Sequence, residues 1–314
     1  MISLKEEIRQ VLSKAQNNYT DLVDIDSINS LVFKGKDKGK DVILKCIKGY
    51  DIFKDAELYL LNYFYKVPYE YISCPIDIFH IFLSPDKYSV YSVYVFDMYI
   101  GDLESLNLTQ FSQDVKTDIC IYLARAVDYI IELGFYHGDL KPKNICLASD
   151  NKVKLIDFGL SDDNDTDLED KYPRIKNTFG FFTPIQCYNH IIYNGNESNI
   201  YQLKEDLAQL LNTTSDTYIK EYGEQNDEFV YGLVCIYIFG DHFNFYTKGK
   251  ISEYTEELNK RIVEGVIEYL KEPKRYVKEV FDMIDLPEDW KILLKDILII
   301  NKDKDEDLET NQVR

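Results

Sequence analysis

Residues 135 to 159 read Phe135-Tyr-His-Gly-Asp-Leu-Lys-Pro-Lys-Asn-Ile-Cys-Leu-Ala-Ser-Asp-Asn-Lys-Val-Lys-Leu-Ile-Asp-Phe-Gly159, and the rest of the chain can be placed around them. Two short runs of strand-forming residues, 145–147 and 153–156, flank the turn-forming segment Ser149-Asp-Asn151. The pattern predicts a hairpin whose two ends carry Asn144 and Asp157 to the same edge. An amide oxygen and a carboxylate are hard ligands that suit Mg²⁺, which in turn binds nucleotide phosphates.

Two charged residues come shortly before Asn144 in the same stretch. Asp139 lies five residues before it, where its carboxylate can accept a proton from an attacking hydroxyl. Lys141 would place positive charge where negative charge builds up on a transferred phosphoryl group. These residues could also be acidic and basic turn residues without a function. The thirteen-residue spacing from Asn144 to Asp157 across a plausible hairpin favours the functional interpretation.

The quoted stretch resembles the signature of eukaryotic-type protein kinases. His137-Gly-Asp-Leu-Lys-Pro-Lys-Asn144 is similar to their catalytic loop, usually H-R-D-L-K-P-x-N, and Asp157-Phe-Gly159 is similar to D-F-G. The resemblance implies an α+β fold over residues 19–300, with a small β-rich N-lobe at 19–98 and a larger, mainly helical C-lobe at 102–300. It also implies ATP and Mg as cofactors, Asp139 and Lys141 as catalytic residues, and Asn144 and Asp157 as metal ligands.

The region before this stretch predicts a helix followed by strands. Residues 1–18 have the apolar spacing of an amphipathic helix that packs on the first lobe. Alternating runs at 30–34 and 41–47, joined by the turn-rich Gly35-Lys-Asp-Lys-Gly39, predict paired strands. Val42-Ile-Leu-Lys45 resembles the V-A-I-K strand of kinases, which makes Lys45 a contact to the inner phosphates. Glu57 lies in a predicted helix at 51–64, and the resemblance implies an ion pair between Lys45 and Glu57.

The glycine-rich loop of the family departs from its pattern here. It should precede Val32 as G-x-G-x-x-G-x-V, but the three glycine positions fall on Ile25, Ser27 and Ser30. Glycine lets a backbone approach phosphates closely, so we expect these side chains to weaken ATP binding. The hydroxyls of Ser27 and Ser30 are predicted to replace some of the backbone contacts to phosphate.

Residues 76–79 and 90–98 predict further strands, and the second leads into a stretch, 95–103, that is similar to the hinge of the family. The resemblance implies that Phe96 lies behind the adenine. It also implies that the backbone of Asp97 and Tyr99 binds the adenine edge and that Asp102 reaches the ribose.

The C-terminal half predicts mostly helices. A long helix is expected at 114–133 with Gly134 as its C-cap, and shorter ones at 254–271, 274–283 and 288–300, before a charged tail at 301–314. Residues 226–240 resemble the central buried helix of kinases, whose Asp227 would hold the backbone of the catalytic loop.

The segment between these helices resembles an activation segment. Residues 161–170 are acidic and have no hydrophobic period, and Thr178–Ile185 resembles the end of the segment. Its closing A-P-E is altered, with Thr183 and Ile185 beside Pro184, and the arginine that pairs with the A-P-E glutamate is missing as well. The glutamate and the arginine are expected to be lost together, because burying one of these charges without the other would destabilise the fold. Residues 187–225 are predicted to be an insertion with a helix near 201–211.

The amino-acid composition restricts the classes of partner and the cellular compartment that we expect. The 314 residues are 45% hydrophobic and carry a net charge of −19, which argues against nucleic acid or an anionic membrane as a partner and favours basic proteins or peptides. Plain solubility would explain the same charge. Six cysteines without a C-x-x-C pair and four dispersed histidines argue against a zinc site and favour a reducing compartment such as the cytoplasm. The longest apolar run, 229–239, is too short to cross a bilayer, and the N-terminus does not resemble a secretory signal.

The function implied by the resemblance is phosphoryl transfer from Mg-ATP to a protein hydroxyl. Lys141 favours serine or threonine over tyrosine as the acceptor. A small-molecule kinase of the aminoglycoside or choline type also uses His-Gly-Asp, but rarely continues with Leu-Lys-Pro and has no Phe-Gly after its metal-binding aspartate. A pseudokinase that acts as a binding module would fit the glycine-poor loop, whereas the presence of Lys45, Asp139, Asn144 and Asp157 argues against it.

Overall fold

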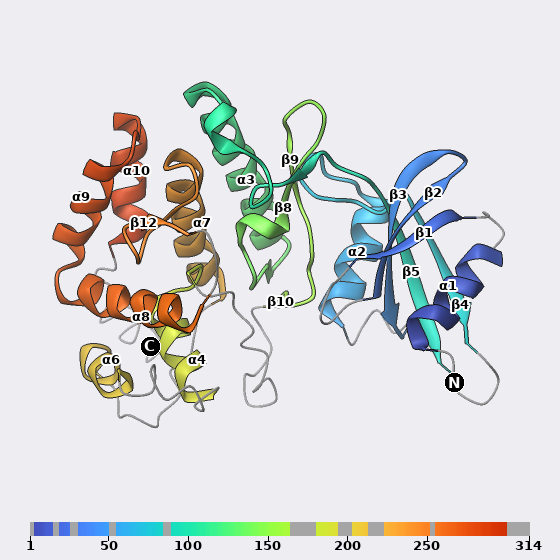
Figure 1. Ribbon diagram of the computed structural model, residues 1–314, viewed down its shortest axis with the longest axis horizontal. Helices are drawn as coiled ribbons and strands as arrows, with labels where there is room; N and C mark the ends of the chain where they lie inside the picture. The colour runs from blue at the N-terminus through green and yellow to red at the C-terminus, as the bar shows by residue number, and fades with distance from the viewer. Residues whose placement is uncertain are drawn as a thin grey trace, which may run out of the picture. The chain divides into compact units, whose positions relative to one another are not determined.

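The computed structural model describes most of the chain, and its contacts divide the chain into two compact units. The described residues are 3–14, 19–25, 31–49, 55–83, 89–163, 180–193, 203–212, 223–251 and 255–299. The first unit comprises Met1–Asp102 with Cys146–Ser161, and the second comprises Leu103–Ile145 with Asp162–Arg314. As predicted, the N-terminal part is rich in strands and the C-terminal part is mainly helical (Figure 1).

A five-stranded antiparallel sheet forms the centre of the first unit, in the order β1-β2-β3-β5-β4. Its strands are β1 (Thr20–Ile25), β2 (Leu31–Asp37), β3 (Lys40–Lys48), β4 (Asp77–Phe82) and β5 (Val90–Asp97). The predicted turn at 35–39 was too long, because β2 and β3 stay paired out to Asp37 and Lys40. Only Lys38 and Gly39 form the turn. Both have positive φ angles, 49° and 89°, as a tight two-residue hairpin requires.

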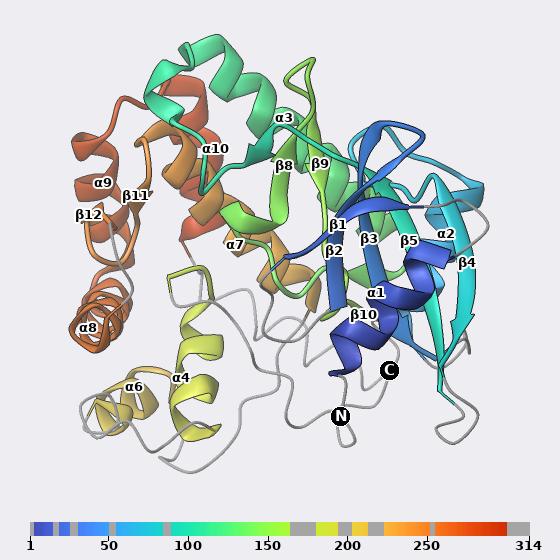
Figure 2. The same cartoon turned by 45° about the vertical axis from the view of Figure 1, so that its right-hand side comes forward.

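One face of this sheet is covered by the N-terminal helix, α1 (Leu4–Lys14), as Figure 2 shows. Ile8 and Leu12 of the helix are fully buried against a cluster that includes Phe33, Leu44 and Val93. The alternating side chains of a strand point to opposite faces, so the residues of β3 between these core positions lie on the other face. Lys45, one of the candidate site residues, lies on that other face.

Helix α2 (Ala56–Lys66) begins after Asp55, whose carboxylate accepts a hydrogen bond from the Leu58 amide at 3.2 Å. The first residues of the predicted helix, 51–54, lie outside the described residues. Phe64 at the far end of α2 is fully buried, and its ring lies 5.3 Å from that of Phe158. The helix is therefore fixed at both ends.

The predicted hairpin is present as β8 (Ile145–Leu147) and β9 (Val153–Leu155). A short strand, β6 (Gly101–Asp102), adds to β8 and makes a three-stranded sheet. Asn151 in the turn has a φ of 60°, a left-handed conformation that asparagine tolerates better than most residues. The turn chemistry seen in the sequence therefore has its expected effect.

The second unit is built around helix α7 (Gly223–Phe239), in which every residue from Phe229 to Phe239 is buried. It packs against α3 (Gln113–Glu132) and α10 (Glu288–Leu298), as Figure 1 shows. Among the residues that the structure describes, the other helices of the unit are α4 (Pro184–Tyr193), α6 (Lys204–Leu210), α8 (Glu256–Lys271) and α9 (Pro273–Met283), with short 3-10 turns at Leu108–Gln110 and Pro142–Asn144. Two small strand pairs complete it: β7 (Phe135–Tyr136) with β10 (Asp162–Asp163), and β11 (Phe243–Asn244) with β12 (Gly249–Lys250).

The cysteines behave largely as small apolar residues. Cys46, Cys120, Cys187 and Cys235 are buried, as expected from the apolar runs around them, and the other two are partly buried. None of the six is paired in a disulfide. In the part of the chain that the structure describes, no helix has the length and apolar character needed to span a bilayer.

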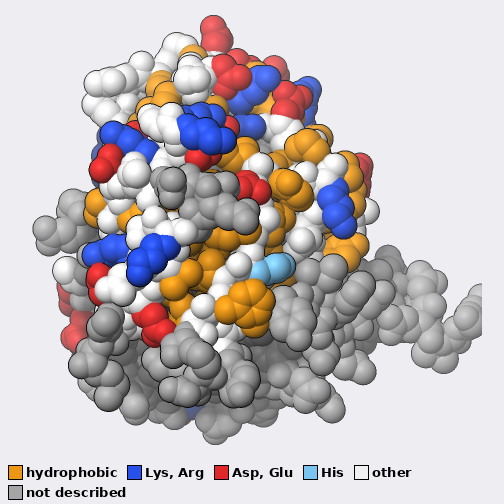
Figure 3. All heavy atoms as spheres, turned by 90° about the vertical axis from the view of Figure 1, so that its right-hand side faces the viewer, with side chains coloured by type: hydrophobic (Ala, Val, Ile, Leu, Met, Phe, Trp, Pro, Cys, Tyr) orange, Lys and Arg blue, Asp and Glu red, His pale blue; other side chains and the backbone are white. Residues whose placement is uncertain are grey.

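The charges on the face in Figure 3 are mixed. Lysine, arginine, aspartate and glutamate side chains lie among exposed hydrophobic ones on this face. Phe82, Ile292 and Val23, at 71%, 62% and 61% exposure, are the most exposed large hydrophobic residues of the described chain. The net charge of −19 is therefore not gathered into one acidic field on the described part of this face.

Candidate functional site

A cluster of three charged side chains lies in the first unit. The Lys45 ammonium on β3 forms an ion pair with the Glu57 carboxylate on α2, and its Nζ also lies 2.7 Å from Asp157 Oδ1. The side chains of Lys45 and Glu57 are each only 13% exposed, whereas that of Asp157 is 45% exposed. The ion pair predicted between Lys45 and Glu57 is confirmed, and Asp157 joins it.

The strand period explains why Lys45 reaches this place. Val42, Leu44 and Cys46 of β3 are buried in the core under α1, so Lys45 projects from the opposite face of the sheet. The strand is held in the middle of the sheet, with Lys45 in register with Val32 on one side and Tyr94 on the other. The lysine therefore rests on a rigid element.

The two carboxylates keep this lysine charged. Burial alone would lower the pKa of Lys45, but the charges of Glu57 and Asp157 outweigh it and raise the pKa above its ordinary value. Burial raises the pKa of Glu57 too, and the single cation offsets this only in part. A fixed cation beside an exposed carboxylate is an arrangement that can bind a phosphate and a metal ion.

The residues after Asp157 fix its position. Asp157 has a φ of 63°, a strained backbone angle for a residue other than glycine. Phe158 is buried with 1% exposure against Phe64 and anchors the segment. Gly159 lies beside the two acids, where a Cβ would be in ordinary van der Waals contact with Asp157 Oδ1 at 3.4 Å and Glu57 Oε2 at 3.5 Å. The three residues therefore place one carboxylate at the surface and one ring in the core.

The second unit holds another cluster, in the loop 137–144. Asp139 Oδ2 lies 2.7 Å from Lys141 Nζ, and it accepts a hydrogen bond from Asn144 Nδ2 at 3.0 Å. The same Asn144 nitrogen donates to the Asp139 backbone carbonyl at 2.8 Å. The loop therefore brings Asp139, Lys141 and Asn144 together, and the Asp139 carboxylate is held by two donors. Their catalytic and metal-binding roles stay predictions.

Asp227 on α7 holds the start of this loop. Its carboxylate accepts hydrogen bonds from the backbone amides of His137 and Gly138, the latter at 3.1 Å, which confirms the predicted role. Burial raises the pKa of Asp227 to about 7, against the opposing effect of the two hydrogen bonds. Gly138 has a φ of 75°, and the Asp139 amide donates to His137 Nδ1 at 3.2 Å. The loop is therefore held mainly through its backbone.

Comparison with known proteins decides the family. Residues 29–206, more than half of the chain, match the family described as Protein kinase domain. The chain belongs to the protein kinase domain family. This confirms the predicted fold and supports protein kinase activity.

The chain is similar to protein kinases from plants and mammals. It is 37% identical over 112 residues to the interferon-induced, double-stranded RNA-activated protein kinase of Rattus norvegicus, covering 35% of this chain and 21% of the relative. It is 32% identical over 109 residues to a probable receptor-like protein kinase of Arabidopsis thaliana, covering 33% and 13%. It is 35% identical over 91 residues to mitogen-activated protein kinase 12 of Oryza sativa subsp. japonica, covering 27% and 15%. The matched part is therefore a small share of each relative.

The residues expected to bind the adenosine part of ATP have other partners within the first unit. Asp97 forms an ion pair with Lys40, and the Tyr99 hydroxyl lies 3.0 Å from Ser73 Oγ. Asp102 pairs with Cys146 across β6 and β8. These contacts do not test whether the backbone of Asp97 and Tyr99 binds adenine or whether Asp102 binds the ribose. Both roles stay predictions. Ser27 and Ser30 lie outside the described residues.

The altered A-P-E contains a local structural feature that the sequence reasoning missed. The Thr183 amide donates to Gln186 Oε1 at 2.9 Å, and the Gln186 amide donates to Thr183 Oγ1 at 3.1 Å. This is a capping box at the start of α4, with Pro184 as the first residue of the helix. Thr-Pro-Ile-Gln was a readable signal for it. The residues that replace A-P-E therefore fix the position at which α4 begins.

Proposed function

We propose that this protein kinase transfers the γ-phosphoryl group of Mg-ATP to serine or threonine hydroxyls of proteins. The observation that carries the proposal is the Asp139 carboxylate, held by Lys141 and Asn144 in the loop that Asp227 fixes. A carboxylate in this state can accept the proton of an acceptor hydroxyl. Lys141 supplies positive charge that stabilises the phosphoryl group during its transfer. The same lysine is the reason for proposing serine or threonine, rather than tyrosine, as the acceptor.

The residues of the first unit would bind the nucleotide. Lys45 would contact the inner phosphates, because its position is fixed by Glu57 and its charge is maintained. Its bond to Asp157 would be exchanged for contacts with the phosphates and the ion. The residues predicted to bind the rest of the nucleotide are Ser27, Ser30, Asp97, Tyr99 and Asp102.

The two predicted metal ligands, Asp157 of the first unit and Asn144 of the second, carry the kind of oxygen donor that magnesium prefers. Asp157 offers a carboxylate, and 45% of its side chain is exposed. Asn144 offers the oxygen of its side-chain amide, because the nitrogen of that amide already donates hydrogen bonds to Asp139. The described residues contain no group of three or more histidine, cysteine, aspartate and glutamate side chains that could hold a metal by themselves. Mg²⁺ is commonly bound by one or two protein ligands with the remainder from phosphate and water. When bound, it would neutralise charge on the phosphates.

The acceptor is proposed to be a protein, and basic sequences are favoured. A net charge of −19 attracts basic partners and repels nucleic acid and anionic membranes. A reducing compartment, such as the cytoplasm, suits six cysteines without a disulfide.

A binding module without catalysis is the second candidate. The observation that favours it is the absence of glycine at the three positions occupied by Ile25, Ser27 and Ser30. A small-molecule kinase is less well supported, because Phe158 is a buried anchor and Asp227 holds the loop, as the resemblance to protein kinases implies.

The test is transfer of label from γ-³²P-ATP with Mg²⁺ to basic and acidic protein acceptors, followed by phosphoamino acid analysis. We expect label on serine or threonine with the wild type and a loss of at least ~100-fold with Asp157→Ala. Asp157→Ala should fold, because Lys45 keeps its pair with Glu57. Label on small alcohols alone would support the small-molecule kinase. No transfer by the wild type, with nucleotide still bound, would support the binding module.

A further inference from the structure

Helix α2 is attached to the sheet at two places, and the second does not involve Glu57. Asn62 Nδ2 donates a hydrogen bond to the Tyr94 hydroxyl of β5 at 2.8 Å. The Tyr94 side chain is fully buried, and Asn62 is partly buried. The bond therefore lies mostly out of reach of water, which would otherwise compete for both groups.

Strand pairing places the two attachment points next to each other on the sheet. Lys45 of β3 and Tyr94 of β5 are directly opposite each other in the antiparallel register. Side chains that are opposite on neighbouring antiparallel strands point to the same face, with their Cβ atoms about 5 Å apart. Both side chains therefore point toward α2, where Lys45 binds Glu57 and Tyr94 binds Asn62.

The spacing of the two contacts along α2 restricts how the helix can move. Glu57 and Asn62 are five residues apart, which corresponds to about 7.5 Å along a helix axis. A helix held at one residue could swing about that residue or rotate about its own axis. A second contact at this distance, on the neighbouring strand, opposes both movements. The two contacts together therefore fix where α2 presents the Glu57 carboxylate.

The Asn62 amide is itself held in one orientation. Its nitrogen also donates to the Leu58 carbonyl, one turn earlier in α2, at 2.8 Å. Turning the amide over would set its oxygen against that carbonyl, so its two hydrogens are assigned to the two acceptors. The Leu58 amide, in turn, donates to Asp55 Oδ1 at 3.2 Å. Both backbone groups of the residue that follows Glu57 are therefore bound by side chains.

The contact between Asn62 and Tyr94 is formed by neutral groups. Burial raises the pKa of Tyr94 to about 12, against the opposing effect of the hydrogen bond from Asn62, so the hydroxyl keeps its proton at neutral pH. Neither group competes with Lys45 for a carboxylate, and salt does not screen a bond between neutral groups as it screens an ion pair. The contact is therefore independent of the charges around Lys45.

We propose that Asn62 and Tyr94 are positioning residues that keep Glu57 against Lys45, whether or not a nucleotide is bound. This rests on the proposed function, in which Lys45 contacts the inner phosphates of ATP. The bond from Lys45 to Asp157 is exchanged when phosphates bind, whereas Asn62 and Tyr94 keep each other as partners. Lys45 then meets the phosphates with Glu57 already in place, so binding does not have to order α2.

The test compares Tyr94→Phe with Tyr269→Phe. Each variant loses one buried tyrosine hydroxyl: that of Tyr94 binds Asn62, and that of Tyr269 donates to the Leu298 carbonyl of the second unit at 2.7 Å. Only Tyr94→Phe removes a contact of α2. The readouts are KM for ATP, KM for a protein acceptor, kcat, equilibrium binding of Mg-ATP, and amide hydrogen exchange of peptides that cover 56–66.

We expect Tyr94→Phe to raise KM for ATP and the exchange of residues 56–66 about fivefold, the equivalent of about 1 kcal/mol for one buried hydrogen bond. KM for the acceptor should change by less than about twofold. Tyr269→Phe should leave KM for ATP and the exchange of α2 near wild type. Equal effects of the two variants on KM for ATP, or no effect of Tyr94→Phe, would overturn the proposal.

A second comparison separates positioning of Glu57 from a general loss of stability. In Glu57→Ala no carboxylate is left to be positioned, so adding Tyr94→Phe should change KM for ATP by less than about twofold. A further fivefold rise in this double variant would show that Tyr94 does not act through Glu57, which contradicts the proposal.

The proposed function can fail separately from this inference. If the wild type binds Mg-ATP but transfers no phosphate, the proposed function fails, and the same comparisons are made with Kd for Mg-ATP in place of KM. No binding of Mg-ATP by the wild type would overturn both.

Discussion

Replacing Lys45 by methionine should destabilise the protein more than replacing its buried partner Glu57 by glutamine. The reason is that one cation serves two carboxylates. Lys45→Met leaves both Glu57 and Asp157 without it, and the Glu57 side chain is only 13% exposed. Glu57→Gln leaves Lys45 paired with Asp157 at 2.7 Å.

The expected magnitudes follow from these contacts. Breaking a buried ion pair by removing one partner costs about 3–5 kcal/mol, and the partial exposure of this pair places Lys45→Met near ~3 kcal/mol. Glu57→Gln removes a charge but keeps a hydrogen-bond acceptor, so its cost should be ~1 kcal/mol. The double variant should be no less stable than Lys45→Met alone, because the unpaired carboxylate of Glu57 is gone.

The assay is urea unfolding of the wild type, the two single variants and the double variant, followed by circular dichroism. Methionine and glutamine preserve the approximate size of the side chains they replace, so differences report charge rather than cavities. The reasoning would be refuted by a Glu57→Gln variant as unstable as Lys45→Met, or by effects that simply add in the double variant.

Two further predictions concern the second unit. Burial raises the pKa of Asp227 from 3.8 to about 7, so between these values the folded state holds a proton that the unfolded state does not. The free energy of unfolding should therefore fall as the pH rises from about 4 to about 7 and level off above it, and Asp227→Asn should flatten this slope in urea titrations; an unchanged slope would contradict the assignment. Gly265→Ala would set a Cβ 1.9 Å from the Tyr246 carbonyl oxygen and should cost ~3 kcal/mol or more in thermal unfolding. Its control, Gly249→Ala, meets nothing closer than 3.7 Å and should stay within about 0.5 kcal/mol; equal losses would argue against the close approach.

Side-chain periodicity was sufficient to predict the longer elements. The alternation in β3 placed Lys45 on the face opposite the core, and the apolar spacing of α3 matched its buried side. Helix α7 was expected from its resemblance to the central buried helix of kinases, and every residue from Phe229 to Phe239 is buried. Motifs at the right spacing predicted the ion pair between Lys45 and Glu57. They also predicted that Asp227 binds the backbone of the loop. These are features that local sequence can carry.

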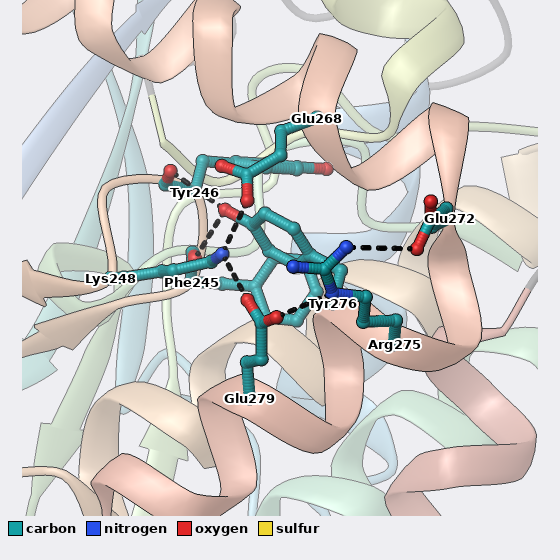
Figure 4. A network of polar contacts seen from close by, with 8 residues as sticks. All are labelled: Phe245, Tyr246, Lys248, Glu268, Glu272, Arg275, Tyr276 and Glu279. Carbon is teal, nitrogen blue, oxygen red and sulfur yellow. Dashed lines mark hydrogen bonds and ion pairs between the residues drawn. The ribbon is translucent and has the colours of Figure 1, made fainter.

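The short strand pairs could not be predicted in the same way. β7 with β10, and β11 with β12, contain two residues each, and their pairing depends on tertiary contacts rather than on a period. The backbone of Tyr246 packs against Gly265 and accepts a hydrogen bond from Tyr276 (Figure 4). These residues lie far along the chain, and nothing in the sequence indicated that they are close to Tyr246. The capping box of Thr183 and Gln186 is local, and the pattern Thr-Pro-Ile-Gln is sufficient to predict it.

The most direct test of the account is the turnover of Asp139→Asn at saturating ATP with a protein acceptor. The substitution keeps the shape of the side chain that Lys141 and Asn144 bind, and it removes the ability to take the acceptor's proton. The account predicts that turnover falls by ~100-fold or more while ATP binding, which depends on Lys45, stays near wild type. A variant that keeps most of its turnover would contradict the role of Asp139 as the base.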